Sequence, residues 1–244
     1  MDAKARLRYS RQMILPEIGE AGQQKLHNAS VMVIGVGGLG SPLAMYLAGA
    51  GVGEIHLVDH DEVDVSNLPR QVLYKTNHIG RHKVEMAAKQ LLAANPGIAV
   101  KSHKVKAEEV WLSKHIGKVD VIFDCTDNLE VRYQINAVAG KAARPVVMAS
   151  AQGLQGQLFS YLPGTACYAC VFPQGDKPPV KNCDTLGVLG PVLGVVASMQ
   201  ALEGLKLLLG MPVASENRLF QLDGHTLEWR NFLVSKDDRC PICN

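Results

Sequence analysis

Four of the six cysteines lie in two C-x-x-C pairs, Cys167 with Cys170 and Cys240 with Cys243. Four thiolates are the usual tetrahedral ligand set of zinc, and a closed set of four leaves no open position for catalysis. The alternative for either pair is a thioredoxin-like redox motif. Because two pairs are present, we expect a structural zinc site that joins the C-terminal segment to the body of the chain.

The other two cysteines differ in their surroundings. Cys183 lies close to Lys181 in a segment rich in Gly, Pro, Asp and Lys. A cation beside a loop thiol can lower its pKa, so Cys183 is a candidate nucleophile, and an inert thiol is the alternative. Cys125 lies at the end of an apolar run, which predicts a small packed side chain.

A glycine-rich segment follows directly after the apolar run 31–34. Gly35, Gly37 and Gly40 match G-x-G-x-x-G, in which glycines permit a tight turn and a close approach of the backbone to phosphate. Asp59 ends the next predicted strand, which is where a ribose-binding carboxylate belongs. The pattern predicts a nucleotide site and leaves both NAD and ATP open.

Two cations, Arg70 and Lys83, follow Asp59 along the chain. Triphosphate chemistry requires positive charge near the phosphates, whereas hydride transfer requires no such pair. The pair therefore favours ATP. Each residue taken alone is more typical of a solvated surface helix.

The segment Asp124–Asn128 begins at the carboxyl end of another predicted strand, the edge at which doubly wound sheets bind ligands. A carboxylate there, such as Asp127, is suited to hold magnesium on a triphosphate. Alternatively, Asp127 or Asn128 caps the helix that follows. The residues alone leave both interpretations open.

Strands and helices that alternate along the first 150 residues are expected to position these side chains. The predicted strands are 31–34, 55–58, 119–123 and 145–149, and the predicted helices are 8–28, the segment up to Ala50, 80–95 and 129–143. This alternation predicts an α/β fold with a doubly wound, Rossmann-like, mostly parallel sheet. Beyond Ser150 we expect an antiparallel extension from 156–161 and 218–234, a long loop over 163–190, and the zinc knuckle.

Length and composition indicate one folded domain, because the chain has 244 residues of which 47% are apolar. The formal net charge of +2 gives no basis for binding nucleic acid or an anionic membrane. The N-terminus has no apolar signal-peptide core. The apolar run 190–210 contains Gln200, Glu203 and Lys206, so it predicts a buried helix instead of a membrane span. We expect a soluble, cytoplasmic protein.

Ordered sequence motifs link these features to a known family. They are RYSRQ (8–12), GVGGLG (35–40), DHDEVDVSNLPRQ (59–71), GRHK (80–83), DCTDN (124–128) and the two cysteine knuckles. In this order, and over nearly the whole chain, they resemble the ThiF/MoeB/HesA family of adenylyltransferases, bacterial relatives of ubiquitin-activating enzymes. The resemblance implies adenylation by ATP of the C-terminal Gly-Gly carboxylate of a ubiquitin-like sulfur-carrier protein. Pyrophosphate is released, and the carrier becomes ready for thiocarboxylate formation.

The resemblance also implies a role for each matching residue. The nucleotide-binding set is Gly35, Gly37, Gly38, Gly40, Asp59, Asp61, Asn67, Arg70, Gln71, Lys83 and Asp127, and Asp127 also holds Mg²⁺. The catalytic set is Arg11, Arg70, Lys83, Asp127 and Cys183. Arg11, a surface arginine on its residue context alone, would reach the partner's site in a homodimer, and Cys183 would bond covalently to the activated carrier. Cys167, Cys170, Cys240 and Cys243 would hold structural Zn²⁺.

The resemblance also implies how the chain is organised and which proteins it acts with. It implies a single adenylation domain over 1–244, with a helical segment (1–28), a nucleotide-binding half (29–150) and a carrier-binding half with the zinc site and crossover loop (151–244). GQQKL (22–26) and NCDTLGVLGPVLGV (182–195) are most similar to the thiamine-pathway member, which implies a ThiS-like carrier and a cysteine desulfurase or other persulfide donor. Pro69 departs from the glutamine that is usual there.

Three alternatives remain open from the sequence. The molybdopterin-pathway member, with a MoaD-like carrier, is the alternative within the family. An NAD-dependent oxidoreductase and a non-catalytic scaffold that binds a ubiquitin-like partner belong to other classes of protein. The cations at Arg70 and Lys83 favour ATP chemistry over both.

Overall fold

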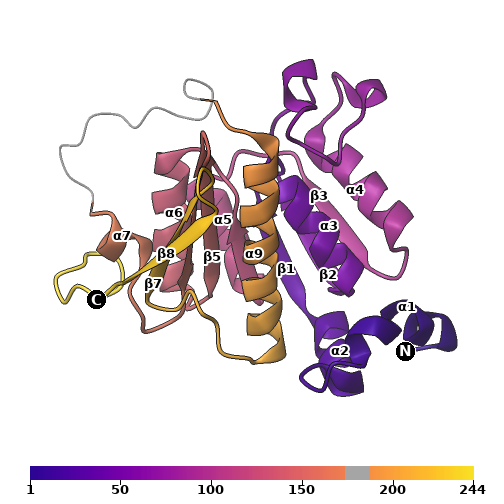
Figure 1. Ribbon diagram of the computed structural model, residues 1–244, viewed down its shortest axis with the longest axis horizontal. Coiled ribbons are helices and arrows are strands. Elements are labelled where there is room, and N and C mark those ends of the chain that lie inside the picture. Colours follow the sequence, from indigo (N-terminus) through magenta and orange to yellow (C-terminus); the bar gives the residue numbers. More distant parts are fainter. Residues whose placement is uncertain (174–186) are drawn as a thin grey trace.

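The computed structural model describes residues 1–173 and 187–244, in which one sheet runs in the order β3-β2-β1-β4-β5-β6-β7-β8 (Figure 1). The first five of these strands in space are parallel, and β6 to β8 continue the sheet antiparallel. This confirms the predicted fold class. The bounds are β1 (Ser30–Ile34), β2 (Glu54–Val58), β3 (Ala99–His103), β4 (Val121–Asp124), β5 (Val146–Gln152), β6 (Gln155–Tyr161), β7 (Arg218–Asp223) and β8 (Glu228–Leu233).

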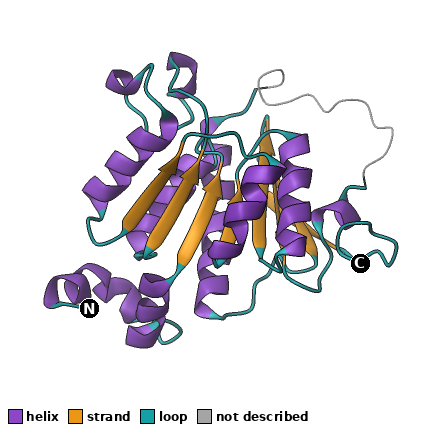
Figure 2. Ribbon diagram, turned by 180° about the vertical axis from the view of Figure 1, so that it is seen from behind, coloured by secondary structure: helices purple, strands orange, loops and turns teal. Residues whose placement is uncertain are grey.

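Helices cover both faces of the sheet (Figure 2). One apolar core lies under α3 (Gly40–Ala50), α4 (Lys83–Ala94) and α9 (Gly190–Leu209), and a second lies under α5 (Glu109–His115), α6 (Leu129–Lys141) and α7 (Tyr168–Val171). Short 3₁₀ turns are η1 (Val65–Asn67), η2 (Thr76–His78) and η3 (Ile116–Lys118). Strands β1 and β4 are apolar on both faces because both faces are covered, which is why they were recognisable as continuous apolar runs.

The strand order reverses between β1 and β4: the chain adds β2 and β3 on one side of β1 and then adds β4 and β5 on its other side. In a doubly wound sheet this switch point leaves a crevice at the carboxyl ends of the two strands. The glycine segment follows β1 and the segment Asp124–Asn128 follows β4, so both predicted motifs flank that crevice.

Helix α9 is the described helix whose length and hydropathy would permit a membrane span. It packs against α3, β4 and β5, so it is a core helix. Two of its polar side chains face inward, since Gln200 and Glu203 are buried. The Gln200 amide donates to the carbonyls of Asp124 (3.0 Å) and Val147 (2.8 Å) and thereby ties α9 to two strands.

Several predicted boundaries were wrong, each for a local reason. The helix predicted over 8–28 is two helices, α1 (Ala3–Met13) and α2 (Gly19–Asn28), because Pro16 and Gly19 interrupt it. The helix predicted from Gly80 begins at Lys83, since Gly80 has a φ of +76°. The long loop predicted over 163–190 contains α7 in its described part. Strand β3 and helix α5 were not predicted, because β3 is a largely exposed edge strand without an apolar run.

Candidate functional site

The glycine turn, residues 35–40, has no room for a side chain at two of its positions. Gly35 has a φ of +84°, and a Cβ added there would lie 2.9 Å from the Cys125 carbonyl oxygen of the neighbouring loop. A Cβ at Gly40 would lie 1.9 Å from the carbonyl oxygen of Gly35. Glycine is therefore required sterically at both positions, and the backbone at the start of α3 stays open to a ligand.

Asp59 supports this turn from behind. Its Oδ2 atom accepts a hydrogen bond from the Val36 N–H (2.8 Å), and its Oδ1 atom accepts one from the Asp61 N–H (2.9 Å). The Tyr74 hydroxyl donates to the Val36 carbonyl oxygen (2.7 Å). Burial, reinforced by the charges of Asp59 and Asp61, raises the pKa of Tyr74, so this hydroxyl remains a donor.

Lys83 is buried, with only 6% of its surface exposed. Its Nζ atom lies 2.9 Å from Asp61 Oδ2, and Asp61 is itself the residue whose N–H bonds to Asp59. The simple expectation of a solvated lysine on a surface helix is wrong here. A buried lysine is rarely found without a partner or a function, and this one is linked through Asp61 and Asp59 to the glycine turn.

Two buried side-chain atoms near the turn lack a hydrogen-bond partner within the described part of the chain. They are Gln71 Oε1 and Ser41 Oγ. Ser41 lies at the first turn of α3, and the Gln71 amide is next to Gly37, where an added Cβ would lie 3.5 Å from Nε2. Unsatisfied buried polar atoms are uncommon, so both are suited to meet the polar groups of a nucleotide.

Asn67 and Arg70 lie on the turn that leads to Gln71. The Asn67 side chain accepts the Asp64 N–H (3.1 Å) and completes the capping of η1, while the Arg70 guanidinium donates to the Ser66 carbonyl (2.8 Å). The backbone of Arg70 also packs against Gly190 at the start of α9. The turn therefore lies beside the start of α9 with Arg70 partly exposed, and contact of Asn67 and Arg70 with phosphates stays a prediction.

In the segment after β4 the capping alternative is confirmed for Asn128, whereas magnesium binding by Asp127 stays a prediction. Asn128 caps α6, because its side chain accepts the Val131 N–H (3.1 Å). The Asp127 carboxylate is exposed and does not serve as the cap. Asp124 turns the loop by accepting the N–H (2.9 Å) and the hydroxyl (2.7 Å) of Thr126. The exposed Asp127 carboxylate thus follows β4 by a short loop, and carboxylate oxygens are ligands that suit a hard cation.

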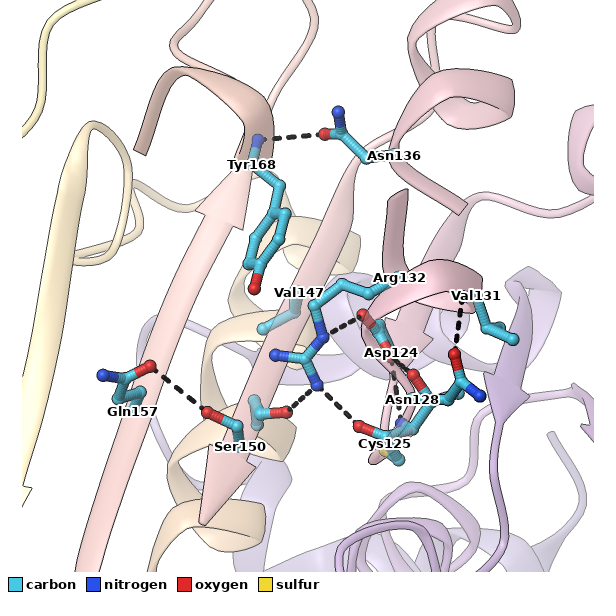
Figure 3. Close-up of polar contacts among 12 residues, drawn as sticks. Asp124, Cys125, Asn128, Val131, Arg132, Asn136, Val147, Ser150, Gln157 and Tyr168 are labelled. Atoms are coloured by element: carbon cyan, nitrogen blue, oxygen red, sulfur yellow. Dashed lines mark hydrogen bonds and ion pairs between the residues drawn. The ribbon is translucent and has the colours of Figure 1, made fainter. Parts of the chain in front are cut away.

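Arg132 is a residue of this site that the sequence prediction missed. It is buried on α6, where its Nε lies 3.1 Å from Asp124 Oδ2 and its Nη2 donates to the carbonyls of Thr126 (2.6 Å) and Ala149 (2.8 Å) (Figure 3). Burial opposes its charge, but the Asp124 carboxylate raises the pKa of Arg132. The signal available in the sequence was a single arginine four residues after the helix cap, which is weak evidence by itself.

Cys125 is the packed residue that the sequence predicted. Burial, helped by the Asp124 charge, raises the pKa of its thiol well above the usual value. The thiol is therefore protonated at neutral pH, and it donates to Gln200 Oε1 (3.4 Å). Such a cysteine is inert as a nucleophile.

The four paired cysteines form one cluster. The Sγ atoms are separated by 3.9 Å (Cys167–Cys170), 3.6 Å (Cys167–Cys240) and 3.5 Å (Cys170–Cys243), and all lie within 4.8 Å of one another. A tetrahedral site with Zn–S bonds of about 2.3 Å requires sulfur atoms roughly 3.8 Å apart. The cluster therefore fits zinc, and this geometry joins the C-terminal segment to α7.

We expect purified protein to contain about one zinc ion per chain. Replacing Cys240 with serine should remove most of the metal and lower Tm by several degrees, because zinc affinity contributes directly to folding. Metal analysis and thermal unfolding measure both effects. The matched control is Cys125→Ala, which removes a buried thiol outside the cluster and should keep the zinc. A Cys240→Ser protein with full zinc content would contradict the assignment.

One predicted site residue, Arg11, is not brought to the crevice. Arg11 is exposed on α1, which lies with α2 beside the amino ends of the parallel strands, opposite to the glycine turn (Figure 2). Cys183 lies outside the described residues. The other predicted residues lie around the switch point or in the cysteine cluster.

A glycine turn at the switch point, a carboxylate behind it and a buried lysine beside it define a nucleotide-binding α/β protein. A model of the ThiF family matches residues 9–242, and the chain belongs to that family. The predicted family is therefore confirmed.

Similar proteins agree with this assignment. The chain is 43% identical over 240 residues to "Sulfur carrier protein ThiS adenylyltransferase" of Escherichia coli (strain K12), which covers 97% of this chain and 94% of that one. It is 42% identical over 241 residues to "Adenylyltransferase and sulfurtransferase MOCS3" of Drosophila grimshawi, which covers 97% of this chain and 54% of that one, so it spans about half of that relative. A crystal structure of E. coli MccB with ATP has a TM-score of 0.83 at 26% identity, covering 97% and 74%. These matches confirm the prediction of an adenylyltransferase.

Proposed function

We propose that the protein uses ATP to adenylate the C-terminal carboxylate of a ubiquitin-like sulfur-carrier protein and releases pyrophosphate. The observation that carries this proposal is the buried Lys83, paired with Asp61 behind the glycine turn. A cation at this place supplies charge for a triphosphate and has no part in hydride transfer. Membership of the ThiF family supports the same choice over an NAD-dependent oxidoreductase and over a non-catalytic scaffold.

The reaction needs positioning and charge more than proton transfer. The carrier's terminal carboxylate is ionised at neutral pH, because an α-carboxyl pKa is about 3.5. Its oxygen forms a bond to the α-phosphorus of ATP while the bond to the bridging oxygen breaks, which yields an acyl-adenylate and pyrophosphate. No general base is required, and the protein contributes orientation and electrostatic stabilisation.

Each residue of the site has a part in this proposal. The glycine turn accommodates the phosphates, and Asp59 meets the ribose hydroxyls. Lys83 and Arg70 supply positive charge, and Asp127 holds Mg²⁺, which would add charge on the triphosphate. Gln71 and Ser41, with their unsatisfied oxygens, complete the nucleotide contacts. The carrier binds to the half formed by residues 151–244. We also propose that the protein is cytoplasmic.

The favoured carrier is ThiS-like, because 43% identity to the ThiS adenylyltransferase extends over 94% of that relative. A MoaD-like carrier is the second candidate, supported by similar identity to MOCS3. A persulfide donor such as a cysteine desulfurase would then supply sulfur to the acyl-adenylate.

Carrier-dependent exchange of labelled pyrophosphate into ATP tests the function directly. We expect exchange with a ThiS-like carrier, Mg²⁺ and ATP, and none with a carrier that lacks its terminal Gly-Gly. A MoaD-like carrier in a parallel reaction ranks the two candidates by kcat/KM. Tight ATP binding without exchange in the presence of either carrier would sink the proposal and leave a scaffold.

A homodimer with Arg11 acting in trans is part of the proposal. In its own chain, Arg11 lies at the end of the sheet opposite to the glycine turn, so it cannot serve that site. Exposed apolar residues on α3 and α9, among them Met45, Tyr46, Val195 and Leu202, offer a surface that a second copy of the chain can cover. Each dimer would then contain two sites, each completed by the other chain.

We further propose that Cys183 traps the activated carrier. Cys183→Ala should keep pyrophosphate exchange within a few-fold of wild type, because the thiol acts after adenylation. The covalent enzyme–carrier species, read by non-reducing electrophoresis and mass spectrometry, should disappear. Persistence of that species in Cys183→Ala would assign it to another cysteine.

A further inference from the structure

The cysteine cluster and the nucleotide loop lie at opposite ends of one face of α6. Arg132 and Asn136, four residues apart on this helix, both contact Tyr168 (Figure 3). Arg132 holds the loop through Asp124 and Thr126. Asn136 holds the cluster, because its Nδ2 donates to Cys167 Sγ (3.5 Å).

Tyr168 joins these two ends. It is next to Cys167 in the first knuckle, and its N–H donates to Asn136 Oδ1 (2.9 Å). Its ring faces Arg132, with Cζ of the guanidinium 5.5 Å from the ring centroid. Tyr168 is buried, as is Arg132, so water does not screen this cation–π contact.

The chain of contacts therefore runs from a metal ligand to the backbone directly before Asp127. Asn136 bonds to both Cys167 and Tyr168, and the Tyr168 ring faces Arg132. Arg132 bonds to the carbonyl of Thr126, the residue directly before Asp127. A knuckle without metal has no bond that keeps its cysteines together, so we expect Tyr168, which follows Cys167 directly, to be held less firmly. Arg132 would lose the ring that limits its orientation while keeping the Asp124 ion pair.

We propose that Tyr168 is a positioning residue that couples zinc in the cysteine cluster to binding of magnesium–ATP at the 124–128 loop. This inference rests on the proposed function, in that Asp127 meets the nucleotide. It assigns to the knuckle an influence on nucleotide affinity in addition to its structural role. Because coupling is reciprocal, ATP must tighten zinc binding by the same factor by which zinc tightens ATP binding.

The test uses the zinc-loaded full chain and a chromophoric chelator that competes for zinc at equilibrium. Zinc affinity is measured with and without saturating magnesium–ATP, and ATP affinity is measured by calorimetry. For the wild type we expect ATP to raise zinc affinity by a factor between roughly threefold and thirtyfold, the range of a desolvated cation–π contact. In Tyr168→Leu this factor should fall to near one, with KM for ATP raised and kcat changed less.

Two further variants separate coupling from general stability. Tyr168→Phe keeps the ring and removes the hydroxyl, which also contacts Arg132, and it should keep most of the coupling. Phe159→Leu, which truncates a buried aromatic ring in the same core without a polar contact to Arg132, should lose comparable stability and also keep the coupling. If general destabilisation were the cause, both leucine variants would lose the coupling to a similar extent.

Four outcomes overturn the inference. They are no effect of ATP on zinc affinity in the wild type, coupling retained in Tyr168→Leu, coupling lost equally in Phe159→Leu, and coupling lost in Tyr168→Phe, which would exclude the ring contact. In each of these cases the protein still binds ATP and catalyses pyrophosphate exchange, so the proposed function stands. Absence of ATP binding by the wild type would overturn both proposals together.

Discussion

Replacing Lys83 with alanine should slow carrier-dependent pyrophosphate exchange by roughly a hundredfold or more, while the protein keeps its fold. Loss of one preorganised charge contact in a transition state typically costs about 3–4 kcal/mol, which sets this scale. Lys83 is buried and pairs with Asp61, which in turn bonds to Asp59 behind the glycine turn. The effect should appear mainly in kcat, since the charge is needed most as pyrophosphate leaves.

Lys89→Ala is the matched control for this variant. Lys89 lies on the same helix, α4, and is exposed to solvent. Its exchange rate should remain at the wild-type value. Because removing Lys83 also leaves Asp61 without its cation, circular dichroism and Tm must show that Lys83→Ala is folded. Exchange within a few-fold of wild type in a folded Lys83→Ala protein would remove Lys83 from the reaction.

Arg11→Ala should be nearly inactive although Arg11 lies far from the glycine turn of its own chain. When Arg11→Ala and Lys83→Ala proteins are mixed and allowed to exchange subunits, activity should return. In the mixed dimer, the site with intact Lys83 receives Arg11 from the other chain, and the opposite site lacks both residues. With equal input and random pairing, about half of the dimers are mixed, so roughly a quarter of wild-type activity should return.

Native mass spectrometry confirms that mixed dimers form. Lys4→Ala, which removes an exposed cation from the same helix as Arg11, should be fully active by itself. Mixed dimers without recovered activity would contradict the role in trans. Activity of Arg11→Ala alone close to wild type would show that the site is complete without it.

The parts of the fold that were predictable were those whose residues carry their own local signal. The strands β1, β2 and β4 are buried on both sides, so their apolar runs mark them directly. The glycine turn was predictable because backbone geometry and the Gly40 contact admit no other residue there. The cysteine cluster followed from the spacing of its two pairs.

The parts that escaped prediction depend on contacts between distant segments. Strand β3 has an exposed, mixed sequence and is specified by pairing with β2. The burial of Lys83 depends on Asp61 reaching it from 22 residues away. Arg132 resembles any helix arginine until β4 and β5 bring Asp124 and the Ala149 carbonyl to it. The burial of Gln200 on α9 likewise depends on the carbonyls of β4 and β5 that accept its hydrogen bonds.

The two hydrogen bonds of Asp59 have a consequence for ligand selectivity. An ionised carboxylate has about four acceptor positions, and the N–H groups of Val36 and Asp61 use only two of them. The turn is thus preorganised before any nucleotide arrives, and little conformational entropy remains to be lost there on binding. With Asp59 at the ribose, as proposed, we expect the remaining lone pairs to accept hydroxyl donors and repel anions, so that a nucleoside with a free 2′-hydroxyl binds better than one carrying a 2′-phosphate.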